Sequence, residues 1–286
     1  MSRILLVGVL AALLCIALNA NGAEPNAPAG RFVEVNGSKL WVEVYGSGGV
    51  PIVFLHGGLH HFANTFARQR EDFSPTRQVV GIDQRGHGHS PDEARQFSYA
   101  EMAEDTAAVI RQLGLGQVDV VGHSDGGNGG LKLARAHPEM VRRLVVSGAS
   151  LRPGLPPDEV LRRLAWSPEQ LAHFIPGFAT RMPSSFRDDY AAVSPDGRDH
   201  WDAFLAKSYR LWLTPVVIEP ADLKAIQAPV LVIAGDHDFS SIEEVAEIYR
   251  GLTKAQLFIV PGSGHGTFEE RAPLVDLALR EFLDRP

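Results

Sequence analysis

The sequence predicts an α/β protein with a mostly parallel sheet that helices cover on both faces. Short runs rich in Val, Ile and Leu recur without polar alternation, which is typical of strands buried on both faces. Amphipathic segments of helical length lie between most of these runs, and strands that alternate with helices usually pair in parallel. One insertion interrupts the alternation, because residues 151–220 contain no strand-like run. We therefore expect a core of residues 31–150 and 221–286 that carries a helical cap at 151–220.

The core is expected to begin with an antiparallel hairpin at one edge of the sheet. Residues 32–35 and 39–45 flank Asn36-Gly37, the favoured two-residue hairpin turn. Further strands are expected at 51–55, 78–82, 118–121, 144–147, 229–234 and 256–260. Helices are expected at 98–113, 127–137, 242–252 and 267–283.

The expected cap is distinctive in composition as well as in pattern. Residues 151–220 are punctuated by proline and hold nine of the 23 Trp, Tyr and Phe residues of the chain. The segment is too long for a plain loop, so we expect helices there. Most of its rings should form the cap's own core, and the rest should wall an apolar pocket.

The N-terminal residues 1–23 predict a secretory signal peptide. One positive charge precedes an unbroken apolar stretch at 4–18, and the small residues at 19–23 suit cleavage. The stretch is short for a membrane span, which needs about 20 residues. We therefore expect a secreted or periplasmic protein without stable membrane insertion, with residues 24–30 as a linker. An uncleaved anchor is the alternative. Cleavage would remove Cys15, the one cysteine of the chain.

The charge balance argues against nucleic acid as a partner. The chain has 27 Lys+Arg against 34 Asp+Glu, a net charge of −7, and no long basic run. Proteins that bind the phosphate backbone of nucleic acids carry a cluster of Lys and Arg, and this sequence has no such cluster. We expect a small-molecule substrate, and the sequence predicts no oligomeric state.

A serine at a strand–turn–helix junction is the candidate nucleophile. The expected strand 118–121 leads into Gly122-His123-Ser124-Asp125-Gly126, a G-x-S-x-G motif, and a helical pattern follows at once. A serine hydroxyl needs a base and a carboxylate to become nucleophilic. His265 follows the last expected strand, and Asp236 and Asp238 follow the one before it. The residues alone leave both aspartates open as the acid.

Five motifs in order make the sequence resemble the α/β-hydrolase superfamily, in its branch of small capped esterases, lactonases, C–C hydrolases and metal-free haloperoxidases. The resemblance runs from about residue 31 to the C-terminus. The motifs are His56-Gly57-Gly58, residues 83–90, residues 122–126, residues 235–238 and Gly264-His265. The resemblance implies the eight-stranded sheet of that fold and no cofactor. Because the family's carboxylate follows a G-x-x-D pattern, it also implies Asp238 as the triad acid, with Asp236 in reserve.

The resemblance further implies that the backbone N–H groups of Gly58 and Asp125 form the oxyanion hole, with Leu59 as the neighbour that would replace Gly58. Asp125, Leu59 and His123 are the candidate substrate-binding residues. The Asp125 carboxylate suits the positive end of the helix that follows, and it would also attract an amine on a substrate. His56 and His60 have the spacing of two metal ligands, but no third ligand is evident, so we expect no metal.

We therefore expect a secreted serine hydrolase that cleaves a small carboxylic ester through an acyl-enzyme. Lactone hydrolysis, C–C bond hydrolysis and cofactor-free haloperoxidation on the same triad are the alternatives. A non-catalytic small-ligand binding protein of the same fold is the alternative from another class. Ser124 argues against epoxide and haloalkane hydrolysis, because relatives with those activities use an aspartate nucleophile at this position.

Overall fold

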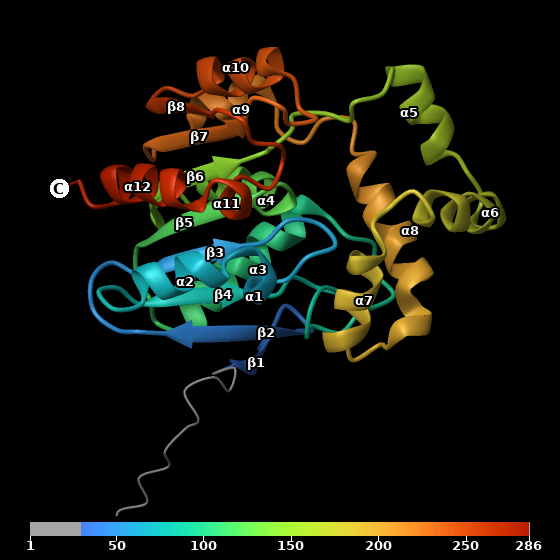
Figure 1. Cartoon of the computed structure of the whole chain (residues 1–286), viewed down its shortest axis with the longest axis horizontal. Helices are drawn as coiled ribbons and strands as arrows, with labels where there is room; N and C mark the ends of the chain where they lie inside the picture. Colours follow the sequence, from blue (N-terminus) through green and yellow to red (C-terminus); the bar gives the residue numbers. More distant parts are fainter. Residues whose placement is uncertain (1–29, 286) are drawn as a thin grey trace, which may run out of the picture.

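The computed structural model describes residues 30–285, so the expected signal peptide and most of the expected linker lie outside the described residues. Eight strands form one sheet in the order β1-β2-β4-β3-β5-β6-β7-β8 (Figure 1). The strands are β1 Gly30–Val35, β2 Ser38–Tyr45, β3 Ile52–Leu55, β4 Val79–Ile82, β5 Val118–His123, β6 Val141–Ser147, β7 Val230–Gly235 and β8 Ala255–Val260. Strand β2 pairs antiparallel with β1 and β4, and the other neighbours pair in parallel. The predicted fold class is confirmed.

The hairpin at the edge forms because its two turn residues accept a left-handed backbone. Asn36 and Gly37 have φ values of 49° and 78°. Two consecutive positive φ angles match the right-handed twist of the two flanking strands. Val35 at the end of β1 therefore pairs directly with Ser38 at the start of β2. The Asn-Gly signal in the sequence therefore predicts both the turn and the register of β1 on β2.

Two layers of helices cover the sheet. The apolar faces of α3 Tyr99–Gln112, α4 Asp125–Ala136, α9 Pro220–Ala225 and α10 Ile242–Gly251 pack on one side. Those of α1 Phe62–Thr65, α2 Ala67–Phe73, α11 Thr267–Glu270 and α12 Ala272–Leu283 pack on the other. The central strands are buried on both faces: Val53 of β3 faces the first layer and Phe54 the second. This double burial explains why these runs are apolar without alternation.

The prediction of one continuous helix at 267–283 is wrong. The segment 267–283 forms α11 and α12, and Arg271 between them has φ −131° and ψ 33°. Pro273 lies in the first turn of α12 and has no N–H to donate to the preceding turn. The amphipathic period runs through the break, so the pattern alone does not reveal it.

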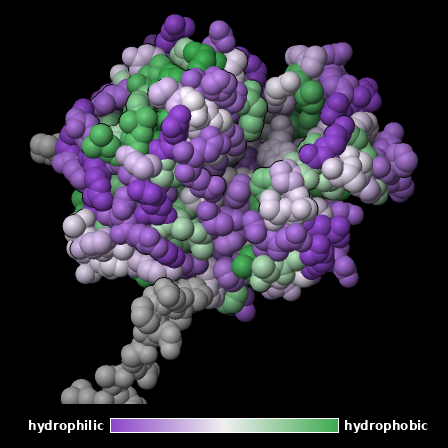
Figure 2. Space-filling model, viewed as in Figure 1, coloured by the Kyte–Doolittle hydropathy of each residue, from purple (hydrophilic) through white to green (hydrophobic). Residues whose placement is uncertain are grey.

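Residues 151–220 form helices that lie to one side of the sheet body (Figure 1). They are α5 Pro157–Leu164, α6 Pro168–Ala179, α7 Ser184–Val193 and α8 Trp201–Trp212, with a short 3-10 turn at Arg198–His200. Their apolar residues form a third cluster around Tyr190, Trp201 and Phe204. The surface is hollowed between these helices and the body of the sheet (Figure 2).

Within residues 30–285, no helix has the length and apolar character that a membrane crossing requires.

Candidate active site

Ser124 occupies a strained turn between β5 and α4. Its backbone has φ 52° and ψ −117°, a conformation that residues with a side chain seldom adopt. A Cβ on Gly122 would overlap the carbonyl oxygen of Gly126, and a Cβ on Gly126 would overlap that of Leu55. The two glycines of the motif are thus required by the close approach of strand and helix, and this approach presents Ser124 at the top of the sheet.

His265 and Asp238 meet above the ends of β8 and β7. The Asp238 side chain is fully buried, and its Oδ1 accepts a hydrogen bond from His265 Nδ1 at 2.9 Å. With Nδ1 so engaged, the other ring nitrogen is free to exchange a proton. A Cβ on Gly148 would lie 2.6 Å from His265 Cε1, so the glycine that follows β6 makes room for the imidazole.

Asp236 has a different partner. Its Oδ1 accepts from the backbone N–H of Ser263 at 3.1 Å and lies 2.8 Å from His237 Nδ1. The backbone N–H of His237 donates a hydrogen bond to the backbone carbonyl of Ser263 at 2.9 Å. Asp236 therefore ties the loop after β7 to the loop that carries His265, and it does not contact the His265 ring.

The turn after β3 lies directly against Ser124. A Cβ on Gly57 would lie 3.1 Å from Ser124 Cβ, and a Cβ on Gly58 would overlap Asp125 Oδ2. The His56 ring stabilises this turn through two hydrogen bonds. Its Nδ1 donates to the Gly57 carbonyl at 2.7 Å, and its Nε2 accepts from the Gln84 backbone N–H at 2.9 Å. Burial, and then the neighbouring His87, lower the pKa of His56 to about 3, so the ring is neutral and structural.

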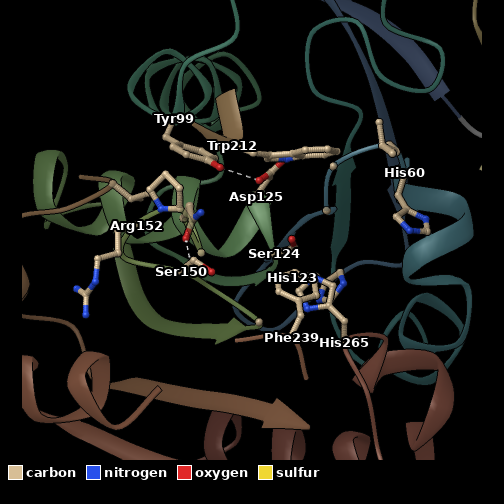
Figure 3. A pocket seen from close by; sticks show the side chains of 18 of the residues that line it. His60, Tyr99, His123, Ser124, Asp125, Ser150, Arg152, Trp212, Phe239 and His265 are labelled. Atoms are coloured by element: carbon tan, nitrogen blue, oxygen red, sulfur yellow. Dashed lines mark hydrogen bonds between the residues drawn. The ribbon is translucent and has the colours of Figure 1, made fainter. Parts of the chain in front are cut away.

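Asp125 is buried where core and cap meet. Tyr99 donates its hydroxyl to Asp125 Oδ1 at 2.8 Å, and Trp212 donates its indole N–H to Oδ2 at 3.0 Å (Figure 3). Burial raises the pKa of the carboxyl, and these two hydrogen bonds oppose the rise. The position immediately after Ser124 predicts a helix-end role, but it does not reveal two donors that come from distant elements.

Six of the candidate residues line one cavity of about 390 Å³. Ser124, Gly58, Asp125, Leu59, His123 and His265 all line it. Leu59 has φ 64° and packs with the apolar cluster of the cap, and His123 lies 4.8 Å from the His265 ring. Burial lowers the pKa of His123 well below its usual value.

Sequence reasoning missed several residues of this wall. They are Tyr99, Asn128, Ser150, Met182, Phe186, Trp212 and Phe239. The aromatic content of 151–220 was the one signal that pointed to any of them. Phe239, which follows Asp238 in the sequence, is exposed. Its ring centroid lies 4.0 Å from that of His265, and Figure 3 shows the two side chains together.

Among residues 30–285, no three His, Cys, Asp or Glu side chains are grouped as a metal ion would require. His56 and His60, which have the sequence spacing of metal ligands, have separate surroundings. His56 is hydrogen-bonded under the turn, and the His60 ring packs edge-on against Phe186 of α7 at 5.1 Å.

Comparison with known proteins decides the family. Residues 52–277 match the family described as the Alpha/beta hydrolase family. The chain belongs to the alpha/beta hydrolase family. The AB hydrolase superfamily protein YisY of Bacillus subtilis is 28% identical over 264 residues, which cover 85% of this chain and 94% of that protein. A 2-hydroxymuconate semialdehyde hydrolase of a Pseudomonas species is 27% identical over 91% of this chain and 96% of its own.

Solved structures agree with this assignment. The esterase EaEST of Exiguobacterium antarcticum superposes with a TM-score of 0.73 at 25% identity, covering 90% of this alpha/beta hydrolase and 100% of that chain. The comparisons thus identify the protein as a hydrolase, and ester hydrolysis is the activity that they favour.

Proposed function

We propose that this alpha/beta hydrolase is a serine hydrolase that cleaves a small carboxylic ester, with Ser124 as nucleophile, His265 as base and Asp238 as acid. The observation that carries the proposal is the Asp238–His265 hydrogen bond of 2.9 Å at the wall of the cavity that Ser124 also lines. A strained serine, an imidazole oriented by a buried carboxylate and adjacent backbone donors are the parts that acyl transfer needs.

The first half-reaction forms an acyl-enzyme. Ser124 Oγ attacks the ester carbonyl carbon while His265 Nε2 takes the hydroxyl proton. The carbonyl electron pair moves onto oxygen, where the N–H groups of Gly58 and Asp125 stabilise it. The oxyanion then collapses, the bond to the alcohol oxygen breaks, and His265 returns the proton to that oxygen. Asp238 keeps the imidazole in the required tautomer throughout.

The second half-reaction repeats these steps with water. His265 takes a proton from a water molecule that attacks the acyl carbon, and the carboxylic acid leaves as Ser124 regains its proton. The size of the cavity supports a small substrate, and its apolar walls, among them Met182, Phe186 and Trp212, support an apolar acyl part.

Hydrolysis of a carbon–carbon bond is the second candidate. The similarity to a 2-hydroxymuconate semialdehyde hydrolase over most of both chains favours it. Lactone hydrolysis and cofactor-free haloperoxidation would use the same three side chains. A non-catalytic ligand-binding protein would not need an oriented imidazole beside a strained serine, and that arrangement argues against it.

We further propose that the protein is exported. The apolar stretch at residues 4–18, with small residues after it, supports a cleaved signal. The full chain expressed in a Gram-negative host should appear in the periplasm or medium with a new N-terminus near residue 24. Recovery of the whole chain in the cytoplasm would contradict export.

A panel of p-nitrophenyl esters from acetate to octanoate, run beside lactones and 2-hydroxymuconate semialdehyde, tests the activity. We expect the highest kcat/KM on a short ester, and a loss of at least about 10³-fold in kcat for Ser124→Ala and for His265→Ala. The double variant should be scarcely worse than either single one, because the residues act as a unit. Ser184→Ala, at an exposed serine of α7, is the control. Retention of more than a few per cent of activity by Ser124→Ala would contradict the assignment.

A further inference from the structure

A second, smaller cavity of about 240 Å³ adjoins the first at His265. The two cavities share His60, His123, Phe186 and His265. Only the larger one is lined by Ser124, Gly58 and Asp125. The smaller one is lined in addition by Thr65, Gly266, Phe268 and Glu269.

The chemistry of acyl transfer assigns the two cavities to two parts of a substrate. The carbonyl carbon must lie at Ser124 with its oxygen toward Gly58 and Asp125, so it sits in the larger cavity. The leaving oxygen must lie toward the imidazole, because His265 hands its proton to that atom. The cavity that contains His265 but neither Ser124 nor the oxyanion donors is therefore on the leaving-group side. In Figure 3, His60 lies on the other side of Ser124 from Tyr99 and Arg152.

The lining of the smaller cavity is polar at specific points. His60 Nδ1 is buried and has no hydrogen-bond partner among the described residues. Thr65 contributes a hydroxyl, and Glu269 contributes a carboxylate from an exposed position of α11, whose first two residues are buried. Phe186 and Phe268 supply the apolar walls between these groups. A short carbon chain with a hydrogen-bond donor at its far end matches this lining.

We propose that the smaller cavity is the leaving-group subsite, and that it takes a short alcohol whose far end donates a hydrogen bond, with Glu269 as an acceptor. The acyl part then occupies the larger cavity. The inference rests on the proposed ester hydrolase function and assigns the alcohol half of its substrate.

Three acetates with the same acyl group test the assignment: 2-hydroxyethyl, 2-methoxyethyl and propyl acetate. The propyl ester has the shape of the hydroxyethyl ester without the donor, and the methoxyethyl ester keeps the electron-withdrawing oxygen without the donor. We expect kcat/KM for the hydroxyethyl ester to exceed both others by about fivefold, the size expected of one net hydrogen bond. Rates of alkaline hydrolysis correct for intrinsic reactivity.

Two variants at Glu269 and one at Met182 test which cavity causes the preference for the hydroxyethyl ester. Glu269→Leu should abolish the fivefold ratio, and Glu269→Gln, which keeps an acceptor oxygen, should retain part of it. Met182 lines the larger cavity alone, so Met182→Ala should change the ranking of acyl lengths and leave the ranking of the three alcohols unchanged. Glu269 is exposed, so its replacement is compatible with folding.

Equal kcat/KM on the three acetates in the wild-type protein would overturn the subsite while leaving ester hydrolysis intact. A change of acyl ranking in Glu269→Leu, with the alcohol ranking preserved, would also overturn it. Absence of turnover on these acetates and on every p-nitrophenyl ester would instead contradict the proposed function itself.

Discussion

Asp236 and Asp238 stand two residues apart in one loop, yet only Asp238 contacts His265. Residues 235–238 form a turn in which the Asp238 N–H donates to the Gly235 carbonyl at 3.3 Å, and within this turn one carboxylate faces the imidazole and the other faces the backbone of Ser263. Both contacts act on the same histidine. Asp238 orients the His265 ring, and Asp236 holds the loop from which the ring projects.

The two aspartates should therefore respond differently to replacement by asparagine. Asp238→Asn should lower kcat by about three to four orders of magnitude, because the amide can hold the wrong imidazole tautomer. Asp236→Asn should cost less than about fivefold, because its amide oxygen still accepts from the Ser263 N–H. Ester turnover and the thermal midpoint of each variant check this. The reverse pattern of losses would move the triad acid to Asp236.

A side chain of α8 contacts the residue that follows Ser124. Trp212, at the end of α8, donates to Asp125, the residue after Ser124. The Trp212 indole also packs against Gly58, because a Cβ added to Gly58 would lie only 3.1 Å from Trp212 Cζ2. The position of α8 and the shape of the turn after β3 are thus linked through the buried carboxyl of Asp125.

Trp212→Phe should keep most of the packing and remove the hydrogen bond to Asp125. We expect the free energy of unfolding to fall by about 1–3 kcal/mol, because the buried carboxyl of Asp125 loses a hydrogen-bond donor. We also expect KM to rise severalfold, with a smaller change in kcat. Trp166→Phe is the matched control, since Trp166 packs within the cap against Phe174. Denaturant titration and ester kinetics measure both effects; equal behaviour of the two variants would contradict the link.

The elements that local pattern controls were predictable, and the elements that packing controls were not. Buried parallel strands and the Asn36-Gly37 turn follow from residue types within a few positions of one another. The Tyr99 and Trp212 donors to Asp125 depend on contacts between distant segments, and the break at Arg271 is hidden by an amphipathic period that runs through it. At the site, the residues alone left both Asp236 and Asp238 open, and the family's G-x-x-D pattern implied Asp238, the aspartate that contacts His265.

Across the whole molecule, buried neutral histidines make stability depend on pH. Burial lowers the pKa of His56 to about 3 and that of His87 to about 4, against about 6.5 in an unfolded chain. At a pH between the folded and the unfolded pKa of each histidine, the unfolded state binds more protons than the folded state. The stabilisation is therefore complete above pH 6.5 and is lost as the pH falls toward 4. Asp276, with its pKa raised to about 6 by burial, opposes part of this loss.

We expect the free energy of unfolding to decrease steadily from pH 7 to pH 5. Each of the two histidines contributes a slope of about 1.4 kcal/mol per pH unit once the pH is below its unfolded pKa. Urea titrations at several pH values measure the slope. His87→Gln should reduce it by about one such increment, and Asp276→Asn should steepen the net acid loss. Stability that is constant or rises toward pH 5 would contradict the neutral, buried state of these rings.

Covalent labelling of the wild-type protein by a fluorophosphonate, read by peptide mass spectrometry, tests the central claim most directly. The reagent reacts with a serine that a neighbouring base has activated, and it needs no knowledge of the natural substrate. We expect one adduct per chain, on Ser124, with none on Ser124→Ala and much slower labelling of His265→Ala. An adduct on a different residue, or no adduct at all on the wild-type protein, would contradict it.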